Sequence, residues 1–157
     1  MRVELDISPH FGQRADLFLG MGGPIEDCIR LSRKEYKKTF HETSLREYQR
    51  GRRKPTTARS LKLQQIRVYS IFCFLLVEPH LKKITHIDID RDFIGHKARI
   101  ADKLGSLIDK AGFSRYNFEI NAEAIAGKGR AHIVANECRT GKRQYRDISA
   151  TNILQYY

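Results

Sequence analysis

The sequence lacks several features that would assign it to a familiar class of protein. Its three cysteines are far apart and form no CxxC pair, so neither a disulfide framework nor a zinc site is expected. Cys73 and Cys138 lie on apolar stretches and are expected to be buried. No basic segment followed by an apolar run precedes the first motifs, which predicts no signal peptide and a cytoplasmic location. The longest apolar run, Ile71 to Val77, is too short to span a bilayer, so no membrane partner is expected.

Common catalytic and recognition motifs are also missing. There is no GxSxG, no cysteine has a recognisable base partner, and the histidines show no HExxH spacing, which argues against serine, cysteine and zinc hydrolases. The segment Gly127 to Arg130 lacks the full GxxxxGK[ST] pattern of a phosphate-binding loop. No zinc-finger, RNP or leucine-zipper pattern predicts sequence-specific readout of nucleic acid. The histidines expected to be structural are His10, His41, His80, His86 and His96.

What the chain does have is a large excess of positive charge. Its 157 residues include 29 lysines and arginines against 18 acidic residues, for a formal net charge of +11. Such an excess favours polyanions through phosphate contacts and counterion release, so nucleic acid is the favoured partner. An acidic protein, a membrane surface or simple solubility would also account for the charge. The length and the 41% hydrophobic content predict a single domain over residues 1–157 with a real core.

The basic residues gather in three groups, each of which includes a tyrosine. Cations interleaved with tyrosines suit phosphate binding with some base stacking, although each group alone is typical of a solvated face. Lys128 and Arg130 flank a glycine before a predicted helix, where free amides and cations favour phosphate. The predicted nucleic-acid contacts are Arg46, Arg50, Arg52, Arg53, Lys54, Lys128, Arg130, Lys142 and Arg143.

Hydrophobic patterning in the first third of the chain favours strands. Arg2 to Ile7 alternates between apolar and charged residues, as a half-buried strand does. Ala15 to Leu19 is a second short candidate, followed by a turn at Met21 to Pro24. Cys28 to Thr39 is ambiguous, and its alternation favours a third strand. Ser44 is expected to open a short helix that ends at a run of basic residues.

The rest of the chain predicts helices alternating with strands. A long helix capped by Thr56 or Thr57 runs to about Val77, where it becomes apolar on all sides, and Pro79 stops it. This indicates a buried central helix. The later elements are a strand over Ile84 to Asp90, a helix over Phe93 to Ala111 closed by Gly112, a strand over Tyr116 to Ile120, a helix carrying Ala131, Val134, Ala135 and Cys138, and a short helix from Ser149.

Three short motifs fall in an informative order along these elements. Leu5–Ser8 (LDIS) lies in the first strand, Asp90–Ile94 (DRDFI) closes the fourth, and Gly127–Ala135 (GKGRAHIVA) leads into the last long helix. Together with the order of elements, they resemble the ribonuclease H-like superfamily over roughly residues 2–140. The resemblance implies an α/β fold with a mixed five-stranded sheet (β-β-β-α-β-α-β-α) flanked by helices.

The resemblance also implies a metal site. Carboxylates on the first strand and at the end of the fourth usually hold magnesium in that superfamily, which assigns metal ligation to Asp6 and Asp90, with Asp88 as a supporting ligand. The implied cofactor is Mg²⁺ or Mn²⁺. Like-charged carboxylates on adjacent strands are unfavourable without a cation. The alternative is that these aspartates are solvated and paired with nearby lysines or arginines, and Asp92 is expected to favour a helix start.

Two positions depart from the family's pattern. The central helix has Lys62 where a glutamate is usual, and the last helix has His132 where an aspartate is usual. His132 could bind metal, transfer a proton or contact phosphate, or be only a hydrogen-bonded helix residue. Lys62 could supply a positive charge in place of a metal, or be solvated. The predicted catalytic residues are Asp6, Asp88, Asp90, His132 and Lys62.

Three hypotheses for function follow. The first is a divergent metal-dependent nuclease that hydrolyses phosphodiester bonds. The second is a non-catalytic nucleic-acid-binding protein on the same fold, in which Lys62 and His132 mark a lost site. The third is a module that binds an acidic protein. The apolar and aromatic tail Ile153 to Tyr157 also suggests a homodimer.

Overall fold

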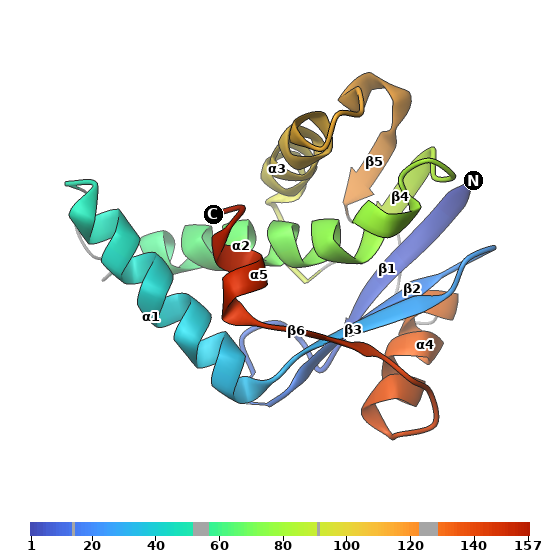
Figure 1. The fold of residues 1–157 in the computed structure, drawn as a ribbon, viewed down its shortest axis with the longest axis horizontal. Helices are drawn as coiled ribbons and strands as arrows, with labels where there is room; N and C mark the ends of the chain where they lie inside the picture. The colour runs from blue at the N-terminus through green and yellow to red at the C-terminus, as the bar shows by residue number, and fades with distance from the viewer. Residues whose placement is uncertain (14, 52–56, 91, 123–128) are drawn as a thin grey trace.

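A six-stranded mixed sheet organises the protein (Figure 1). The computed structural model describes residues 1–13, 15–51, 57–90, 92–122 and 129–157. The sheet order is β5-β4-β1-β2-β3-β6, with β1, β2 and β3 antiparallel and the remaining pairs parallel. The predicted α/β class with a mixed sheet is confirmed, with six strands in place of the expected five. The strands are β1 (Arg2–Ser8), β2 (Leu17–Gly22), β3 (Asp27–Leu31), β4 (His86–Ile89), β5 (Glu119–Ala122) and β6 (Arg146–Ile148).

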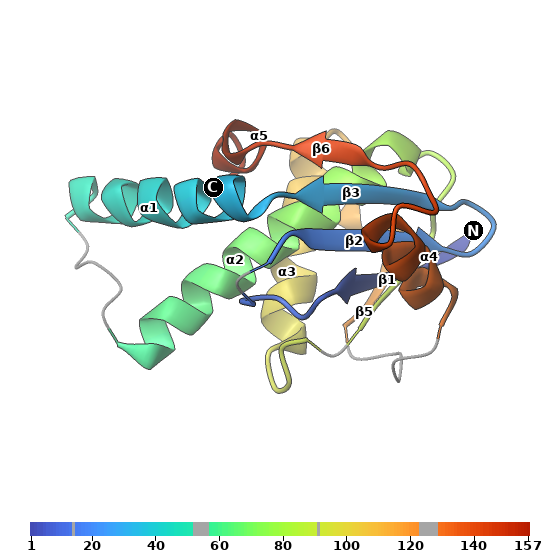
Figure 2. The ribbon, with the colours of Figure 1, turned by 90° about the horizontal axis from the view of Figure 1, so that it is seen from below.

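Helices cover both faces of this sheet. The long helix α2 packs with α3 on one face, and α4 lies on the opposite face (Figure 1). Helix α1 continues from the end of β3 and projects beyond the sheet (Figure 2). The helices are α1 (Arg33–Gln49), α2 (Ala58–Val77), α3 (Lys97–Lys110), α4 (Arg130–Arg139) and α5 (Ala150–Leu154), with short 3-10 turns η1 (Glu78–His80) and η2 (Arg115–Asn117).

The main core lies between α2 and the sheet. Val3, Leu5 and Ile7 of β1 alternate onto the α2 face, as their period of two requires, and all three are buried. Thr57 caps α2 with a reciprocal hydrogen-bond pair to Ser60, which confirms one of the two predicted caps. Residues 58–80 are long and apolar enough to cross a membrane, but 67% of the apolar stretch is buried inside the fold, as in the core helix of a soluble protein. The predicted buried central helix is therefore confirmed.

The clearest error of the sequence prediction is at α1. The strand β3 ends at Leu31, and the chain is helical from Arg33 to Gln49, so a strand through Thr39 and a helix start at Ser44 are both wrong. Ser32 is the actual cap, because its hydroxyl accepts a hydrogen bond from the backbone N–H of Glu35 at 3.3 Å. A serine followed three residues later by a glutamate is a helix-start signal that outweighs short alternation.

Smaller differences concern the ends of elements. The predicted turn at Met21 begins too early, because Met21 is a buried β2 residue that pairs with Leu5 and Asp27. Helix α3 starts at Lys97 rather than Phe93, so Asp92 does not start a helix. The other predicted strands overlap β4 and β5 with ends shifted by one to three residues. The short strand β6 went unpredicted, because three residues are too few for a periodic pattern.

The C-terminal tail packs into its own fold. Ile153 and Leu154 are buried, and the Tyr156 hydroxyl donates a hydrogen bond to the Glu78 carboxylate at 2.9 Å. The apolar tail that suggested a homodimer is thus largely used within the protomer, and the homodimer stays a prediction. The three cysteines, Cys28, Cys73 and Cys138, are buried free thiols, which confirms the expected burial of Cys73 and Cys138.

The topology brings several chain segments to one edge of the sheet. Because β3 and β4 run in the same direction as β1, all three strands end at the same edge. Helix α1 leaves the sheet at this edge, and the loop after β1 starts there (Figure 2). Phe11 of that loop lies 5.6 Å, centroid to centroid, from Tyr36 of α1 and 5.4 Å from Tyr69 of α2. The site described next lies at this edge.

Two glycines on β2 let α4 approach the sheet closely. A Cβ placed on Gly20 would lie 2.6 Å from both the Ala131 carbonyl oxygen and the Ala135 backbone nitrogen. A Cβ on Gly22 would meet the Ala131 backbone even more closely. A side chain at either position would therefore collide with backbone, so glycine fixes the spacing between helix and sheet. This spacing decides how far α4 side chains reach across the sheet.

Candidate active site at the carboxyl ends of β1 and β4

Two carboxylates meet where β1 and β4 end. Leu5 pairs with Ile89, and the Asp90 backbone N–H donates to the Leu5 carbonyl at 3.0 Å, so Asp6 and Asp90 lie side by side. Both belong to the alternation set that faces away from α2. Burial raises the pKa of Asp6 to about 6; the hydrogen bond from His132 lowers it, and the nearby Asp90 carboxylate raises it. Asp6 therefore holds its proton more tightly than an exposed aspartate does.

A histidine from the opposite helix completes this pair. His132 on the first turns of α4 places Nδ1 2.7 Å from Oδ2 of Asp6, while Asp6 Oδ1 accepts the backbone N–H of Ile7 at 2.8 Å. The Asp6 side chain is almost fully buried, whereas 46% of the His132 side chain is exposed. The imidazole is therefore fixed at one nitrogen and accessible to solvent at its outer part. Of the alternatives predicted for His132, the structure shows the hydrogen-bonded helix residue.

A second histidine–aspartate pair lies beside the first. His10 Nδ1 is 2.8 Å from Oδ1 of Asp92, whose side chain is almost fully buried while that of His10 is mostly exposed. The hydrogen bond and the charge of Asp92 raise the pKa of His10, and the charges of Asp6 and Asp90 raise it further. Burial raises the pKa of Asp92, against the lowering effect of His10. Sequence reasoning had treated His10 as structural, because its partner lies 82 residues away in no recognisable spacing.

Asp88 lies on the same face as Asp90 but has a different partner. Its carboxylate forms an ion pair with the Arg2 guanidinium, at the start of β1 rather than at its end. Arg2 is largely exposed, whereas the Asp88 side chain is buried. The structure therefore brings Asp6, Asp90 and His132 together and gives Asp88 a cation of its own, two residues further back along β4.

Lys62 approaches the same edge from α2. Its Nζ lies 4.4 Å from the ring centroid of Phe93, in a cation–π contact. Phe93 follows Asp92 directly, and its ring also packs on Tyr69, with 5.1 Å between the centroids. The central helix thus contributes a cation near the segment that follows β4.

The donor set can be tested against a divalent cation. Mg²⁺ and Mn²⁺ prefer carboxylate oxygens, and magnesium usually binds one or two carboxylates together with water and substrate phosphates. Asp6 and Asp90 supply two such groups at one point. In the described part of the chain, no three or more histidine, cysteine, aspartate or glutamate side chains are grouped so that they could hold a metal ion. Asp6 and Asp90 are therefore the two carboxylates, from neighbouring strands, whose chemistry suits such an ion.

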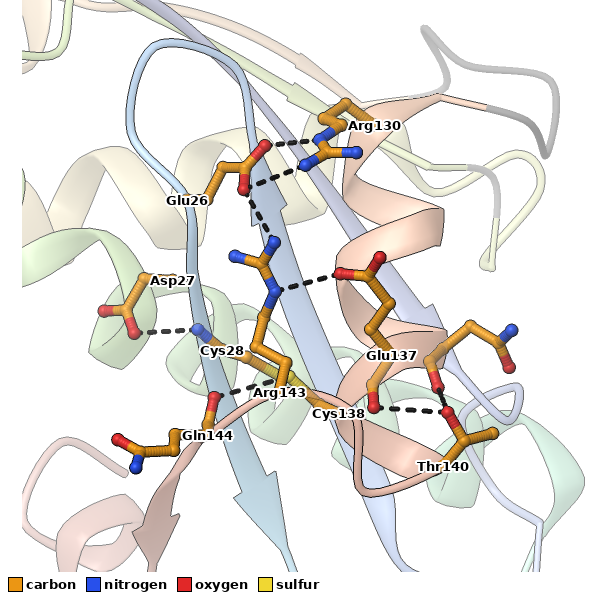
Figure 3. Close-up of polar contacts among 10 residues, drawn as sticks. Glu26, Asp27, Cys28, Arg130, Glu137, Cys138, Thr140, Arg143 and Gln144 are labelled. Carbon is orange, nitrogen blue, oxygen red and sulfur yellow. Dashed lines mark hydrogen bonds and ion pairs between the residues drawn. The ribbon is translucent and has the colours of Figure 1, made fainter.

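Two of the predicted phosphate-binding arginines are engaged in internal ion pairs (Figure 3). Arg130 at the start of α4 forms a two-point contact with the Glu26 carboxylate. Arg143 lies between Glu26, at 2.8 Å, and Glu137, at 3.0 Å. The backbone N–H of Arg130 also donates to Glu4 at 3.0 Å, so a carboxylate already occupies the helix N-terminus. These cations hold α4 against the sheet.

The remaining predicted contacts are scattered. Arg46 donates a hydrogen bond to the Leu154 carbonyl, which joins α1 to α5. Arg50 and Lys142 are exposed at the ends of α1 and α4, respectively. Four predicted contacts lie outside the described residues, namely Arg52, Arg53, Lys54 and Lys128.

A more coherent basic surface is formed by the first turns of α1. Arg33, Lys34, Lys37 and Lys38 are all exposed there. This surface begins at the sheet edge where β1 and β4 also end, and the Phe11–Tyr36 contact links it to the loop that carries His10.

Comparison of the chain with protein-family models, with curated proteins and with solved structures finds no match.

Proposed function

We propose that this protein is a ribonuclease H-like, divalent-metal-dependent nuclease that hydrolyses phosphodiester bonds. The observation that carries the proposal is the meeting of Asp6, Asp90 and His132 from three distant parts of the chain at one sheet edge. Strand ends of this kind collect functional groups in α/β proteins, and a carboxyl group with a perturbed pKa is typical of functional sites.

The topology supports the resemblance on which the proposal draws. The first three strands form an antiparallel meander, and β1 lies beside β4, so the first-strand and fourth-strand aspartates become neighbours. The last long helix supplies His132 at the same point. These are the positions to which the sequence motifs had assigned the metal ligands and their assisting residue.

The proposed roles follow from the chemistry of the side chains. Asp6 and Asp90 would hold the divalent ion, which would supply activation of the attacking water and charge stabilisation for the leaving group. His132 fixes the Asp6 carboxylate through Nδ1 and presents its exposed edge to a phosphate oxygen. His10, fixed by Asp92, is a second donor on the loop side of the same site. Lys62 adds positive charge near the segment after β4.

The basic surface on α1 supports a nucleic-acid substrate. Its four exposed cations start at the end of β3, two strands from β1, so a polyanion bound along α1 would reach the end of the sheet that carries the carboxylates, with about 10 Å between β3 and β1. The +11 charge of the whole chain gives the long-range attraction. Binding by this surface predicts an affinity that falls steeply as the salt concentration rises.

The test is a cleavage assay on labelled single-stranded and double-stranded DNA and RNA, with magnesium or manganese titrated into the wild type. The variants are Asp6→Asn and Asp90→Asn, with Asp102→Asn on the exposed side of α3 as a matched control. Metal-dependent cutting that both site variants lose, and the control keeps, supports the proposal. The absence of cutting of all four substrates by the folded wild type rules out the nuclease.

A second candidate is a non-catalytic nucleic-acid-binding protein on the same fold. It is favoured by Lys62, which brings a cation to the end of the sheet where the resemblance would place a third carboxylate. In this case binding would be steeply salt-dependent, and Asp6→Asn and Asp90→Asn would leave it unchanged. The same assay, read for binding as well as cutting, separates the two candidates.

A further inference from the structure

A pocket of about 430 Å³ opens beside the proposed catalytic site, on the same face of the sheet. It lies at the same ends of β1 and β3, and its lining includes Pro9, Phe18, Arg30, Arg139 and Tyr145. The volume lies within the range of small-molecule sites. None of these residues belongs to the carboxylate and histidine cluster, so the pocket needs an explanation of its own.

The strand register fixes the position of the pocket relative to Asp6. Asp6 pairs with Gly20, and Ser8, two residues further along β1, pairs with Phe18. Phe18 pairs in turn with Arg30 on β3, so the three side chains lie on the α4 face in one row. Two residues of strand correspond to about 7 Å, and β2 and β3 lie about 5 and 10 Å across the sheet from β1, so the pocket is on the order of 10 Å from Asp6. A nucleic-acid strand whose phosphate is at Asp6 can therefore place the base of an adjacent nucleotide in the pocket.

The pocket contains stacked planar groups. The Arg30 guanidinium carbon lies 4.8 Å from the centroid of the Tyr145 ring, and Phe18 meets that ring edge-on at 5.2 Å and 80°. Tyr145 is 36% exposed, so part of its surface is available to a ligand. Tyrosine rings and arginine guanidinium planes are the groups on which proteins stack unpaired bases.

The Arg30 cation of the pocket is neutralised by carboxylates, one of them Asp147 just outside the lining, which makes Arg30 a poor phosphate ligand. Arg30 forms a two-point contact with Asp147, at 2.6 and 3.1 Å, and lies 3.7 Å from Asp16. Arg139 donates to Asn136 at 2.8 Å. Asp16 Oδ1 accepts the Arg33 backbone N–H at 2.8 Å, and the Asp16 side chain is 40% exposed, which leaves acceptor capacity facing solvent. A neutral planar ligand that carries N–H donors matches this set of groups.

We propose that the pocket binds a nucleobase with an exocyclic amino group, that is, guanine, adenine or cytosine, from a nucleotide next to the one bound at Asp6. The base stacks on Tyr145 and Arg30, and its amino group donates to Asp16. The inference rests on the proposed function for its substrate class, and it adds a base preference that the charge of the chain alone would not give.

The test measures binding of the nucleoside monophosphates GMP, AMP, CMP and UMP by NMR, in EDTA so that no divalent ion bridges the phosphate to the carboxylates. Ribose 5-phosphate and inorganic phosphate serve as ligands without a base. The three amino-bearing nucleotides are expected to bind more tightly than UMP, and all should shift the Tyr145 and Arg30 signals. Tyr145→Ala should weaken binding about tenfold or more, Tyr145→Phe should preserve it, and Tyr116→Ala, which removes a 92% exposed tyrosine on η2, should have no effect.

Two outcomes would contradict the proposal that the pocket binds a nucleobase. One is binding of ribose 5-phosphate as tight as that of GMP, which would indicate a phosphate site. The other is binding that Tyr145→Ala leaves unchanged. The nucleotide-binding measurement is repeated in a double variant, Asp6→Asn with Asp90→Asn. The base-binding proposal and the nuclease proposal can then fail separately. Base-dependent binding without any metal-dependent cutting retains the pocket and rejects the nuclease, whereas cutting without base-dependent binding does the reverse.

Discussion

Asp6 and His132 lie 2.7 Å apart, Oδ2 to Nδ1, although 126 residues separate them in the chain. One is a buried strand residue and the other is on a helix that packs across the same face. Their contact makes the pair of strand-end carboxylates asymmetric, because within the described residues the imidazole of His132 is hydrogen-bonded to Asp6. The electrostatic state of Asp6 therefore reports on the position of α4.

Removal of the imidazole should raise the pKa of Asp6. The hydrogen bond from His132 now lowers that pKa against the opposite effects of burial and Asp90, so His132→Ala should move it above its present value of about 6. The measurement is an NMR titration of the Asp6 carboxyl carbon in EDTA. His41→Ala, at an exposed position on α1, is the control and should leave the titration unchanged. An Asp6 pKa that falls in His132→Ala would contradict this picture.

The free energy of unfolding of Asp6→Asn, relative to that of the wild type, should rise with pH between about pH 4 and above pH 6. Burial raises the native pKa of Asp6 to about 6, against about 3.9 in an unfolded chain, so the native state holds this proton more tightly. The wild type consequently loses stability relative to the variant as pH rises from about 4 to above 6. Urea titrations in EDTA at several pH values measure the difference.

Asp109→Asn gives the control of opposite sign. The Asp109 carboxylate accepts the backbone N–H of Arg115 at 2.7 Å and pairs with its guanidinium, which lowers the pKa of Asp109. The wild type should therefore gain stability relative to Asp109→Asn above about pH 4 and lose that advantage as the pH falls through the native pKa. The same pH trend in both variants would show that the burial of Asp6 does not control the effect.

Gly20→Ala should destabilise the protein by about 1–3 kcal/mol and disturb the contact between His132 and Asp6. The new methyl group would lie 2.6 Å from backbone atoms of α4, which cannot move without the whole helix. Gly105→Ala in α3 is the matched control. Its Cβ would have as nearest neighbours Arg115 side-chain atoms at 3.5 Å, so a helical glycine is replaced without a clash and stability should rise by up to about 1 kcal/mol. Thermal or urea unfolding measures both, and equal effects would rule out the packing argument.

Thr57→Ala should cost about 1 kcal/mol of folding free energy. The Thr57 hydroxyl accepts the Ser60 N–H at 3.2 Å, and the Ser60 hydroxyl accepts the Thr57 N–H at 3.1 Å, so the variant removes one half of a reciprocal cap on the core helix. Thr57→Ser keeps the hydroxyl and should stay within a few tenths of a kcal/mol of the wild type. The urea midpoint measures both, and a loss in Thr57→Ser as large as in Thr57→Ala would argue against the cap.

The native protein should resist alkylation at all three cysteines. Cys28, Cys73 and Cys138 are buried, and burial raises the pKa of each thiol, so little thiolate is present at neutral pH. Iodoacetamide at pH 7.5 (about one unit below the pKa of a free cysteine) should label the unfolded chain and leave the folded chain unmodified over the same time. Rapid labelling of the folded protein, followed by mass spectrometry, would show that a thiol is accessible.

Local sequence predicted much of the fold because the core elements have clear periods. The alternation from Arg2 to Ile7 and the apolar second half of α2 each have one structural solution, and both are present. The alternation after Cys28 was misleading, because it continues past Leu31 into residues that the Ser32 cap commits to a helix. Three residues of β6 carry too little pattern for any such argument.

The candidate site also has a part that the sequence predicts and a part that it does not. Asp6 and Asp90 could be predicted, since each belongs to a recognisable strand motif and parallel pairing makes them neighbours. The pairing of His10 with Asp92 depends on the path of a loop, which no local pattern encodes. Arg130 was predicted to bind phosphate, but a carboxylate from the loop before β3 pairs with it, and that contact joins residues 104 apart.

The two β2 glycines also provide a way to find relatives of this chain. Gly20 and Gly22 face Ala131 and Ala135. The close approach of helix and sheet therefore has a sequence signature: two glycines two residues apart on one segment and two alanines four residues apart on another. Such small residues are hard to exchange, because any larger one must separate two layers of backbone. A sequence search could combine these two spacings, about 110 residues apart, with an aspartate at the end of an early strand. Such a search would detect distant relatives of this chain even after most surface residues have diverged.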